Sequence, residues 1–217
     1  ADKPEPLASA MRRDPGRFDA WPIEDLELGH RFVKTLACNW KVFWDNFNEC
    51  LHCPNVHPSL VKLVPIYARR ISGKWDDPDY AAHADDPDPK FQGGLREGAQ
   101  SWSSDGRASP VPIPGLDDAH KAMGQTYVIS WPTMFMVGHA DYMRIVRMRP
   151  LGPEETEITA EWLFPKGARE HPDFDLENIV GFAKQVIAED GAASELNQKG
   201  MHARPYTAGV LMPEETS

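Results

Sequence analysis

Apolar and polar residues alternate along much of the second half of the chain. The runs at 142–149 and 156–164 place an apolar residue at roughly every second position, which is typical of strands buried on one face of an antiparallel sheet. With two shorter apolar runs they predict a meander of four consecutive strands: Thr126–Trp131, Met134–Val137, Asp141–Arg149 and Glu157–Phe164.

One helix is predicted before this meander and one after it. After Pro172, apolar residues recur at helical spacing and predict a single long helix from Asp175 to about Met201. Nearer the N-terminus, a strand-like run from His30 to Cys38 leads into a helix predicted from Trp40 to Leu51 or His52. Because proline cannot continue an established helix, we expect Pro54 to end it.

The remaining segments have the composition of linkers and loops. Residues 1–28 are rich in proline and charge and are predicted to be a linker or approach segment, with residues 29–217 forming one domain. Between 65 and 125 the pattern is irregular, and the stretch from Trp75 to Pro89 is crowded with aspartate and proline, as in surface loops. This region is expected to be either a solvated insertion or a lid over a pocket.

His52 and His57 are the first candidates for chemistry. On a regular helix, residues five apart point about 140° away from each other. A turn at Pro54 removes that obstacle, because the chain can bring His57 back beside His52. Two adjacent imidazoles form half of a metal site. The other histidines are expected to be solvated or to make ordinary hydrogen bonds: His30, His83, His120, His139, His171 and His202.

Asp190 is the second candidate, because it lies on the apolar face of the long C-terminal helix. It follows Ile179 by eleven residues, which places it only about 20° around the helix from that residue. An unpaired carboxylate buried there would cost several kcal/mol. Asp190 must therefore be protonated, paired with an arginine or histidine, or bound to a cation, and the last choice would complete the site begun by the two histidines.

Charge and composition exclude several classes of function. The chain of 217 residues has a formal net charge of −10, whereas nucleic-acid binding needs clustered lysine and arginine. No apolar run approaches the ~20 residues that span a bilayer, and no signal-peptide pattern is present. Three cysteines do not make a disulfide framework. We therefore expect a cytoplasmic protein with reduced cysteines and with neither membrane nor nucleic acid as a partner.

Three kinds of metal site match these residues. The first is structural zinc, although eight residues leave little chain to wrap around a tetrahedral ion held by Cys50, His52, Cys53 and His57. The second is catalytic zinc, which suits His52, His57 and Asp190 by ligand type. The third is the two-histidine, one-carboxylate facial triad of non-haem Fe(II) oxygenases, which leaves positions open for O2 and substrate.

Two stretches resemble one protein family. The run from Asn39 to His57 resembles the iron-binding motif in the catalytic domain of Rieske-type non-haem iron oxygenases, the ring-hydroxylating oxygenase alpha subunits. The run from Ala188 to Gly200 resembles the C-terminal ligand motif of that family. The resemblance implies that one mononuclear Fe(II) is held by His52, His57 and Asp190.

The same resemblance implies roles for neighbouring residues and a fold. Glu49 takes the place of an acidic bridge, often Asp in the family, that passes electrons to the first histidine. Asn46, Glu195 and Gln198 take supporting positions. The implied fold is α+β, a helix-grip (START/SRPBCC-like) arrangement in which an antiparallel sheet wraps around the long C-terminal helix. The first ligand helix is expected to close one end of the cavity.

The implied activity is the use of Fe(II) and O2 to hydroxylate or oxidatively demethylate a small organic substrate, aromatic or not. Electrons would come from a Rieske [2Fe–2S] cluster in a neighbouring subunit of a trimer, supplied by a reductase or ferredoxin. Such a cluster needs two cysteines and two histidines, usually as Cys-x-His and Cys-x2-His, and this chain has no such pair. The cluster is therefore expected in a missing domain or a partner.

A non-catalytic reading remains open beside this one. The same helix-grip shell also serves as a binding module for hydrophobic ligands, which needs no metal. Three aromatic residues of the predicted meander are candidates for a substrate pocket and equally for the core of the sheet: Tyr127, Trp131 and Phe135.

Overall fold

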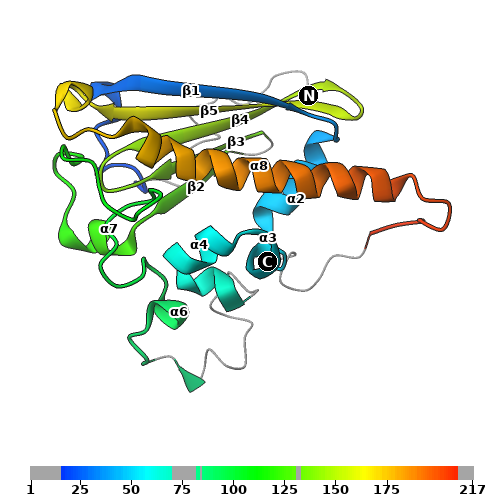
Figure 1. The fold of residues 1–217 in the computed structure, drawn as a ribbon, viewed down its shortest axis with the longest axis horizontal. Coiled ribbons are helices and arrows are strands. Elements are labelled where there is room, and N and C mark those ends of the chain that lie inside the picture. Colours follow the sequence, from blue (N-terminus) through cyan, green and yellow to red (C-terminus); the bar gives the residue numbers. More distant parts are fainter. Residues whose placement is uncertain (1–15, 70–81, 84, 131–132, 210–217) are drawn as a thin grey trace.

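A computed structural model describes residues 16–69, 82–83, 85–130 and 133–209 (Figure 1). Its centre is one antiparallel sheet with the strand order β1-β5-β4-β3-β2. The strands are β1 (Leu26–Leu36), β2 (Thr126–Ser130), β3 (Met134–Gly138), β4 (Met143–Gly152) and β5 (Glu155–Pro165). The meander predicted from the alternation is therefore confirmed, although Trp131 lies outside the described residues.

The first strand joins the sheet from far away in the sequence. β1 pairs with β5 from Leu26 opposite Pro165 to Leu36 opposite Thr156. It begins four residues before the predicted start at His30, because these earlier residues still have backbone partners on β5. The division between a linker and a domain at residue 28 stays a prediction, since residues 1–15 lie outside the described part of the chain.

The long C-terminal helix α8 (Leu176–Met201) covers one face of the sheet (Figure 1). Asp175 caps its first turn by accepting a hydrogen bond from the backbone N–H of Asn178 at 3.0 Å. Its buried face meets the inward side chains of β5 in a single core cluster. The approach to β1 is close: a Cβ atom added at Gly191 would lie 2.7 Å from Leu36. The α+β helix-grip arrangement is confirmed.

Part of the opposite face of the sheet is covered by the segment that precedes β1, which includes the short 3-10 helix η1 (Ile23–Asp25). Trp21 is buried there, and its indole N–H donates to the carbonyl of His139 at 3.0 Å. Gly138 permits this contact, because a Cβ atom at that position would lie 2.5 Å from the Trp21 ring. The second face of the sheet is thus packed near Trp21, whereas the part that carries Val33, Arg147 and Arg149 is exposed.

A group of short helices lies beside the middle of α8: α2 (Trp40–Asn48), α3 (Cys53–Val56), α4 (Pro58–Leu63) and η2 (Pro65–Arg69) (Figure 1). The predicted helix from Trp40 to Leu51 or His52 was too long. It ends at Asn48, because Glu49 takes an extended backbone and its side chain accepts a hydrogen bond from Leu51 N–H. Pro54 is the second residue of α3, in the first turn, where proline has no N–H to leave unpaired.

The irregular region before β2 contains α6 (Pro89–Gln92) and α7 (Asp118–Met123), which have no buried residues, but part of the stretch between them reaches the core. Trp102 is only 2% exposed. Asp141, which is fully buried, accepts hydrogen bonds from the Ser101 hydroxyl and from Ser109 N–H. A solvated insertion does not describe this part of the chain, whereas most of the loop-like stretch from Trp75 to Pro89 (70–81 and 84) lies outside the described residues. After β5 the 3-10 helix η3 (Ala168–Glu170) leads into α8.

Candidate metal centre

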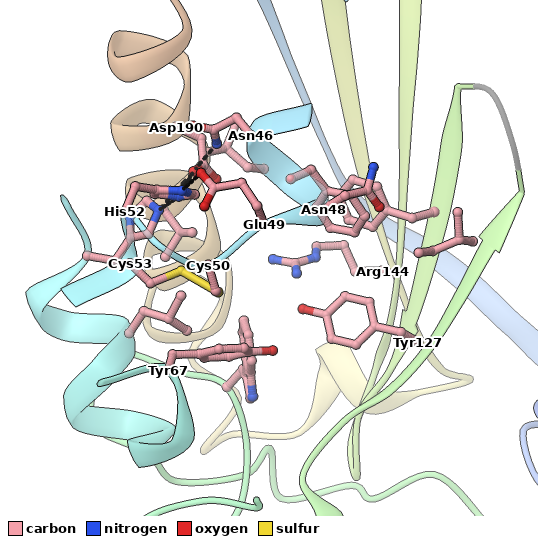
Figure 2. Close-up of a pocket in the computed structure, with 18 residues that line it drawn as sticks. Asn46, Asn48, Glu49, Cys50, His52, Cys53, Tyr67, Tyr127, Arg144 and Asp190 are labelled. Atoms are coloured by element: carbon pink, nitrogen blue, oxygen red, sulfur yellow. Dashed lines mark hydrogen bonds and ion pairs between the residues drawn. A yellow bond between two sulfur atoms is a disulfide. The ribbon is translucent and has the colours of Figure 1, made fainter. Parts of the chain in front are cut away.

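Three potential ligand atoms from two distant parts of the chain meet at one point (Figure 2). His52 Nε2 lies 3.1 Å from His57 Nε2, and Asp190 Oδ1 lies 3.3 Å from the first and 2.8 Å from the second. His57 is 1% exposed, and the Asp190 side chain is 15% exposed. The structure therefore brings together the three residues that the sequence nominated.

The spacing of these atoms matches one metal ion. First-row divalent metals bind nitrogen and oxygen donors at about 2.0–2.2 Å, so two donors at right angles lie about 3.0 Å apart. The three observed separations, 2.8, 3.1 and 3.3 Å, bracket this value. Two imidazoles and one carboxylate on one side of an ion leave its other positions open, as in the facial triad. The residues present fit a mononuclear metal.

Local structure explains how the two histidines meet. His52 precedes the first residue of α3, and His57 follows its last residue and precedes α4. One short helical turn between them replaces the regular helix on which they would diverge. Pro54 and Pro58 occupy first-turn positions of α3 and α4, where proline is well tolerated. The two prolines thus define the bend that carries the ligands.

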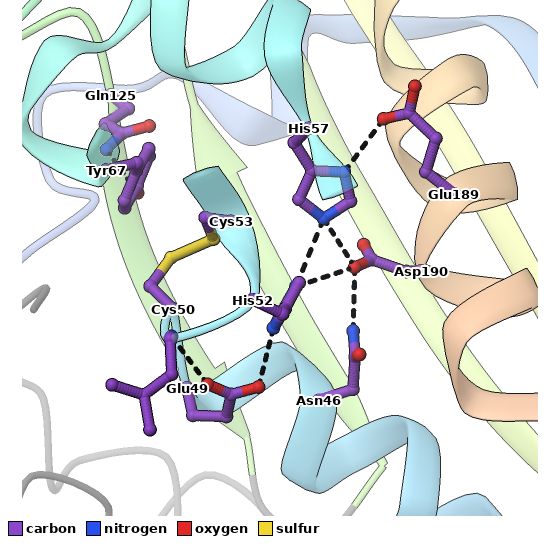
Figure 3. The surroundings of a disulfide bond; sticks show 11 residues. Asn46, Glu49, Cys50, His52, Cys53, His57, Tyr67, Gln125, Glu189 and Asp190 are labelled. Carbon is purple, nitrogen blue, oxygen red and sulfur yellow. Dashed lines mark hydrogen bonds and ion pairs between the residues drawn. A yellow bond between two sulfur atoms is a disulfide. The ribbon is translucent and has the colours of Figure 1, made fainter. Parts of the chain in front are cut away.

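Each potential ligand has an outer partner (Figure 3). Glu49 Oε1 lies 2.6 Å from His52 Nδ1, and Glu189 Oε2 lies 2.8 Å from His57 Nδ1. Because carboxylate oxygens accept hydrogen bonds, each Nδ1 donates, which directs the other ring nitrogen toward the metal position. Asn46 Nδ2 donates to Asp190 Oδ1 at 2.7 Å. Glu189 was not among the residues predicted from the sequence.

The charges of this cluster are balanced by mutual hydrogen bonds. Burial lowers the pKa of His52, but hydrogen bonds to Asp190 and Glu49 outweigh it and raise the pKa to about 9. Burial also lowers the pKa of His57, and the hydrogen bond to Asp190 again raises it above its ordinary value. Burial raises the pKa of Asp190, but hydrogen bonds from both histidines bring it below the ordinary value. A metal ion would replace the protons that hold these side chains together.

Glu195 and Gln198 act at a distance from the three ligand atoms. Glu195 Oε1 accepts from Ala37 N–H at 3.0 Å, and Gln198 Oε1 accepts from Asn39 N–H at 2.9 Å. Both bonds join α8 to the connection between β1 and α2. Since Asn39 caps α2, these side chains fix the helix that carries Asn46 against the helix that carries Asp190.

The cysteines differ from the expectation of three reduced thiols. Cys50 and Cys53 form a disulfide, and only Cys38, which is buried, is free. The bend before α3 brings the two Cα atoms to 5.0 Å, within the usual range for disulfides, and the sequence spacing alone does not reveal this approach. Cys53 Sγ lies within 4.8 Å of the histidine ligand atoms. Its bond to Cys50 leaves no thiolate for the four-ligand zinc site.

A cavity of about 200 Å³ opens beside these ligand atoms. Tyr127 and Phe135 line it, as predicted for a pocket, and Phe47 stacks on Phe135 with ring centroids 3.8 Å apart. Trp131, the third predicted pocket residue, lies outside the described residues. Two further lining residues, Trp102 and Arg144, were not predicted. The volume is below the ~300–1,000 Å³ of pockets for drug-sized ligands, so the cavity suits a small molecule.

Among the described residues, no helix has the length and apolar character needed to cross a membrane.

Comparison with known proteins gives the same picture. The model of the ring-hydroxylating alpha subunit family (catalytic domain) matches residues 23–217. The glycine betaine monooxygenase oxygenase subunit of Chromohalobacter salexigens is 25% identical over 227 aligned residues, covering 96% of this chain and 51% of that protein. The carnitine monooxygenase oxygenase subunit of Acinetobacter baumannii is 46% identical over 44 residues, covering 20% of this chain and 12% of that protein.

Solved structures share the fold. A quaternary ammonium Rieske monooxygenase superposes with a TM-score of 0.60 at 18% identity, over 95% of this chain and 50% of that one. Naphthalene 1,2-dioxygenase from Rhodococcus sp. superposes with a TM-score of 0.53 at 13% identity, over 94% of this chain and 52% of that one. The chain thus spans about half the length of these relatives. It belongs to the family of ring-hydroxylating oxygenase alpha subunits and corresponds to their catalytic domain.

Proposed function

We propose that this chain is the catalytic domain of a Rieske-type oxygenase that uses one Fe(II) and O2 to hydroxylate or oxidatively demethylate a small organic substrate. The observation that carries the proposal is the mutual approach of His52 Nε2, His57 Nε2 and Asp190 Oδ1 to within 3.3 Å. Family membership favours iron over zinc for this donor set.

The side chains of this site have separable tasks. His52 and His57 would bind the metal through Nε2 as neutral imidazoles, each held in orientation by a carboxylate on Nδ1. Asp190 would supply the single negative charge, and Asn46 would hold its ligand oxygen in place. Bound Fe(II) would supply the O2 chemistry at its open positions beside the substrate. The aromatic walls of the cavity would exclude water from that chemistry.

Electrons for this reaction would come from a Rieske [2Fe–2S] cluster outside this chain. Glu49 is the candidate bridge, because its Oε1 contacts His52 Nδ1 at 2.6 Å and its side chain is still 18% exposed. We further propose a homo-oligomer, a trimer by family resemblance, and a reductase or ferredoxin as the electron source. The solved structure of a related quaternary ammonium Rieske monooxygenase, described as showing inter-subunit electron transfer, supports this arrangement.

The first test measures iron after anaerobic loading with Fe(II) and desalting. We expect about one iron per chain, lost in His52→Ala and in Asp190→Ala. The matched control is His171→Ala, which removes an imidazole 38% exposed and outside the site. No bound iron, or iron that is indifferent to Asp190, would contradict the oxygenase proposal. That result would favour a helix-grip module that binds hydrophobic ligands without metal.

A further inference from the structure

Arg144 is a buried cation in the wall of the cavity. It lies on β4, is 5% exposed, and pairs across the sheet with Trp162 on β5. Figure 2 shows its guanidinium pointing into the cavity, between Tyr127 on one side and Glu49 and Asn48 on the other. Arginine is almost never this buried unless something pairs with it.

No described residue pairs with Arg144. Its Nε is buried and lacks a hydrogen-bond partner, and the side chain makes no ion pair with another described residue. Its nearest compensation is the Trp102 ring, whose centroid lies 5.8 Å from the guanidinium carbon. The next arginines of the strand differ: Arg147 and Arg149 are on the opposite face and pair with Glu161 and Glu157. Burial of an unpaired charge is strongly unfavourable.

A second donor in the same wall also lacks an acceptor. Trp102 lines the cavity, and its buried Nε1 has no hydrogen-bond partner among the described residues. Indole N–H and guanidinium groups only donate, so neither can satisfy the other. Arg144 thus gives the cavity wall one unpaired positive charge, whose complement is an anionic oxygen, whereas Trp102 Nε1 is itself too buried to face the cavity.

The acidic groups around the cavity do not fill this need. Glu49 and Asp190 are hydrogen-bonded to the histidines of the metal centre. Burial raises the pKa of Tyr67 and that of Tyr127, so both hydroxyls keep their protons and supply no negative charge. The counter-charge for Arg144 must come from a molecule that enters the cavity.

We propose that Arg144 binds the carboxylate of the substrate, so that the substrate class of this site is a small organic monocarboxylate. The inference rests on the proposed function and deepens it. One arginine balances one negative charge, and a guanidinium matches a carboxylate with two parallel hydrogen bonds. Anchoring at Arg144 directs the rest of the molecule along the aromatic walls toward the metal centre, which lines the same cavity.

The test compares each acid with an analogue of nearly the same shape in which an uncharged ester or amide replaces the carboxylate, called here the neutral analogue or partner because its acyl group is neutral. The probes are γ-butyrobetaine with its methyl ester, and 3-phenylpropionate with 3-phenylpropanamide, so that both a cationic and an aromatic remainder are represented. Binding is measured by titration calorimetry on the iron-loaded chain. At least one acid should bind about tenfold or more tightly than its neutral partner, as expected for a charge-assisted hydrogen-bond pair.

Substitutions assign that preference to Arg144. In Arg144→Gln the acid should lose its advantage while the neutral analogue binds as before, and Arg144→Lys should keep part of it. The matched control is Arg147→Gln, on the opposite face of the sheet, which should leave the preference intact. Removing a buried unpaired charge should not lower the melting temperature, so loss of folding cannot imitate the result.

We expect the preference for acids to be independent of iron. Failure of carboxylate binding at Arg144 can therefore be distinguished from failure of the iron-dependent oxygenase function. The variant His52→Ala, without iron, should still prefer the acid. The inference is overturned if no acid binds more tightly than its neutral analogue, with absence of any binding included, or if Arg144→Gln keeps the preference.

Discussion

His57 and His139 are equally buried, each 1% exposed, yet their surroundings drive their pKa values in opposite directions. His57 lies between Asp190 and Glu189, and the hydrogen bond to Asp190 overcomes burial and raises its pKa. Within the described part of the chain, His139 has no carboxylate partner, and it donates from Nδ1 to the carbonyl of Gly124. Burial lowers its pKa to about 3, with a further contribution from the charge of Arg144.

The difference shows that burial alone does not make a histidine a ligand. A metal site needs imidazoles held by groups that favour positive charge, because the same groups stabilise a bound cation. His57 has that environment, whereas His139 has an environment that excludes cations. The two histidines therefore act as internal controls for each other.

The largest expected effect comes from replacing each histidine by leucine. His57→Leu removes one of three ligands and should weaken Co(II) binding by at least about 100-fold, since losing an outer partner alone costs about 10–100-fold. His139→Leu should leave Co(II) binding unchanged and lower stability by about 1–3 kcal/mol through the lost hydrogen bond. The absorption of bound Co(II) measures the metal affinity, and urea unfolding measures the stability. Loss of Co(II) binding in His139→Leu would contradict the distinction between His57 as a ligand and His139 as a buried histidine that binds no metal.

A smaller effect is expected from the outer partner of His57. Glu189→Gln keeps a hydrogen-bond acceptor but removes its charge, so metal affinity should fall by about tenfold while saturation still reaches one metal per chain. Calorimetric titration with Co(II) gives both numbers. Glu177→Gln is the control on the same helix, because that carboxylate is 77% exposed. Equal affinities for Glu189→Gln and wild type would mean that the charge of Glu189 does not act on the metal.

A third expected effect is a pH dependence of stability. The pKa of His139 is about 3 in the folded chain and 6.5 in its ordinary state, so unfolding takes up a proton below pH 6.5. Above pH 6.5 the full contribution of His139 to the free energy of unfolding is present. Below that pH this contribution falls by about 1.4 kcal/mol per pH unit toward pH 3. His57, whose pKa is raised, takes up no proton on unfolding in that range. Urea unfolding between pH 7 and 4.5 should therefore show a steeper decline in wild type than in His139→Leu, and parallel curves would refute this account.

The sequence allowed prediction of the parts of the fold that repeat a simple pattern. Alternation revealed the strands from Thr126 onward, and helical spacing both located α8 and placed Asp190 on its apolar face. The approach of His52 to His57 is predicted from a turn at Pro54. Pro54 does not end α2, however, and lies instead in the first turn of the short helix α3. The end of α2 at Asn48 had no signal, because glutamate is a good helix former, although the bond that Glu49 accepts from Leu51 N–H is local.

Other parts of the site needed the structure. Alternation puts Arg144 on the same face as Val146 and Met148, both buried, so a signal existed. Three arginines within six residues nevertheless look equivalent in the sequence, and only the partners of Arg147 and Arg149 set Arg144 apart. The Cys50–Cys53 disulfide depends on the bend between α2 and α3, which spacing does not report.

The separation of the ligands along the chain has a consequence for biosynthesis. His52 and Asp190 are 138 residues apart, and a ribosome makes the chain from its N-terminus. The two imidazoles therefore emerge well before the carboxylate, as an incomplete pair without the helix that supplies Asp190 and Glu189. Selective metal loading must wait until α8 has docked on the sheet, so the last long element to be made decides when the site exists.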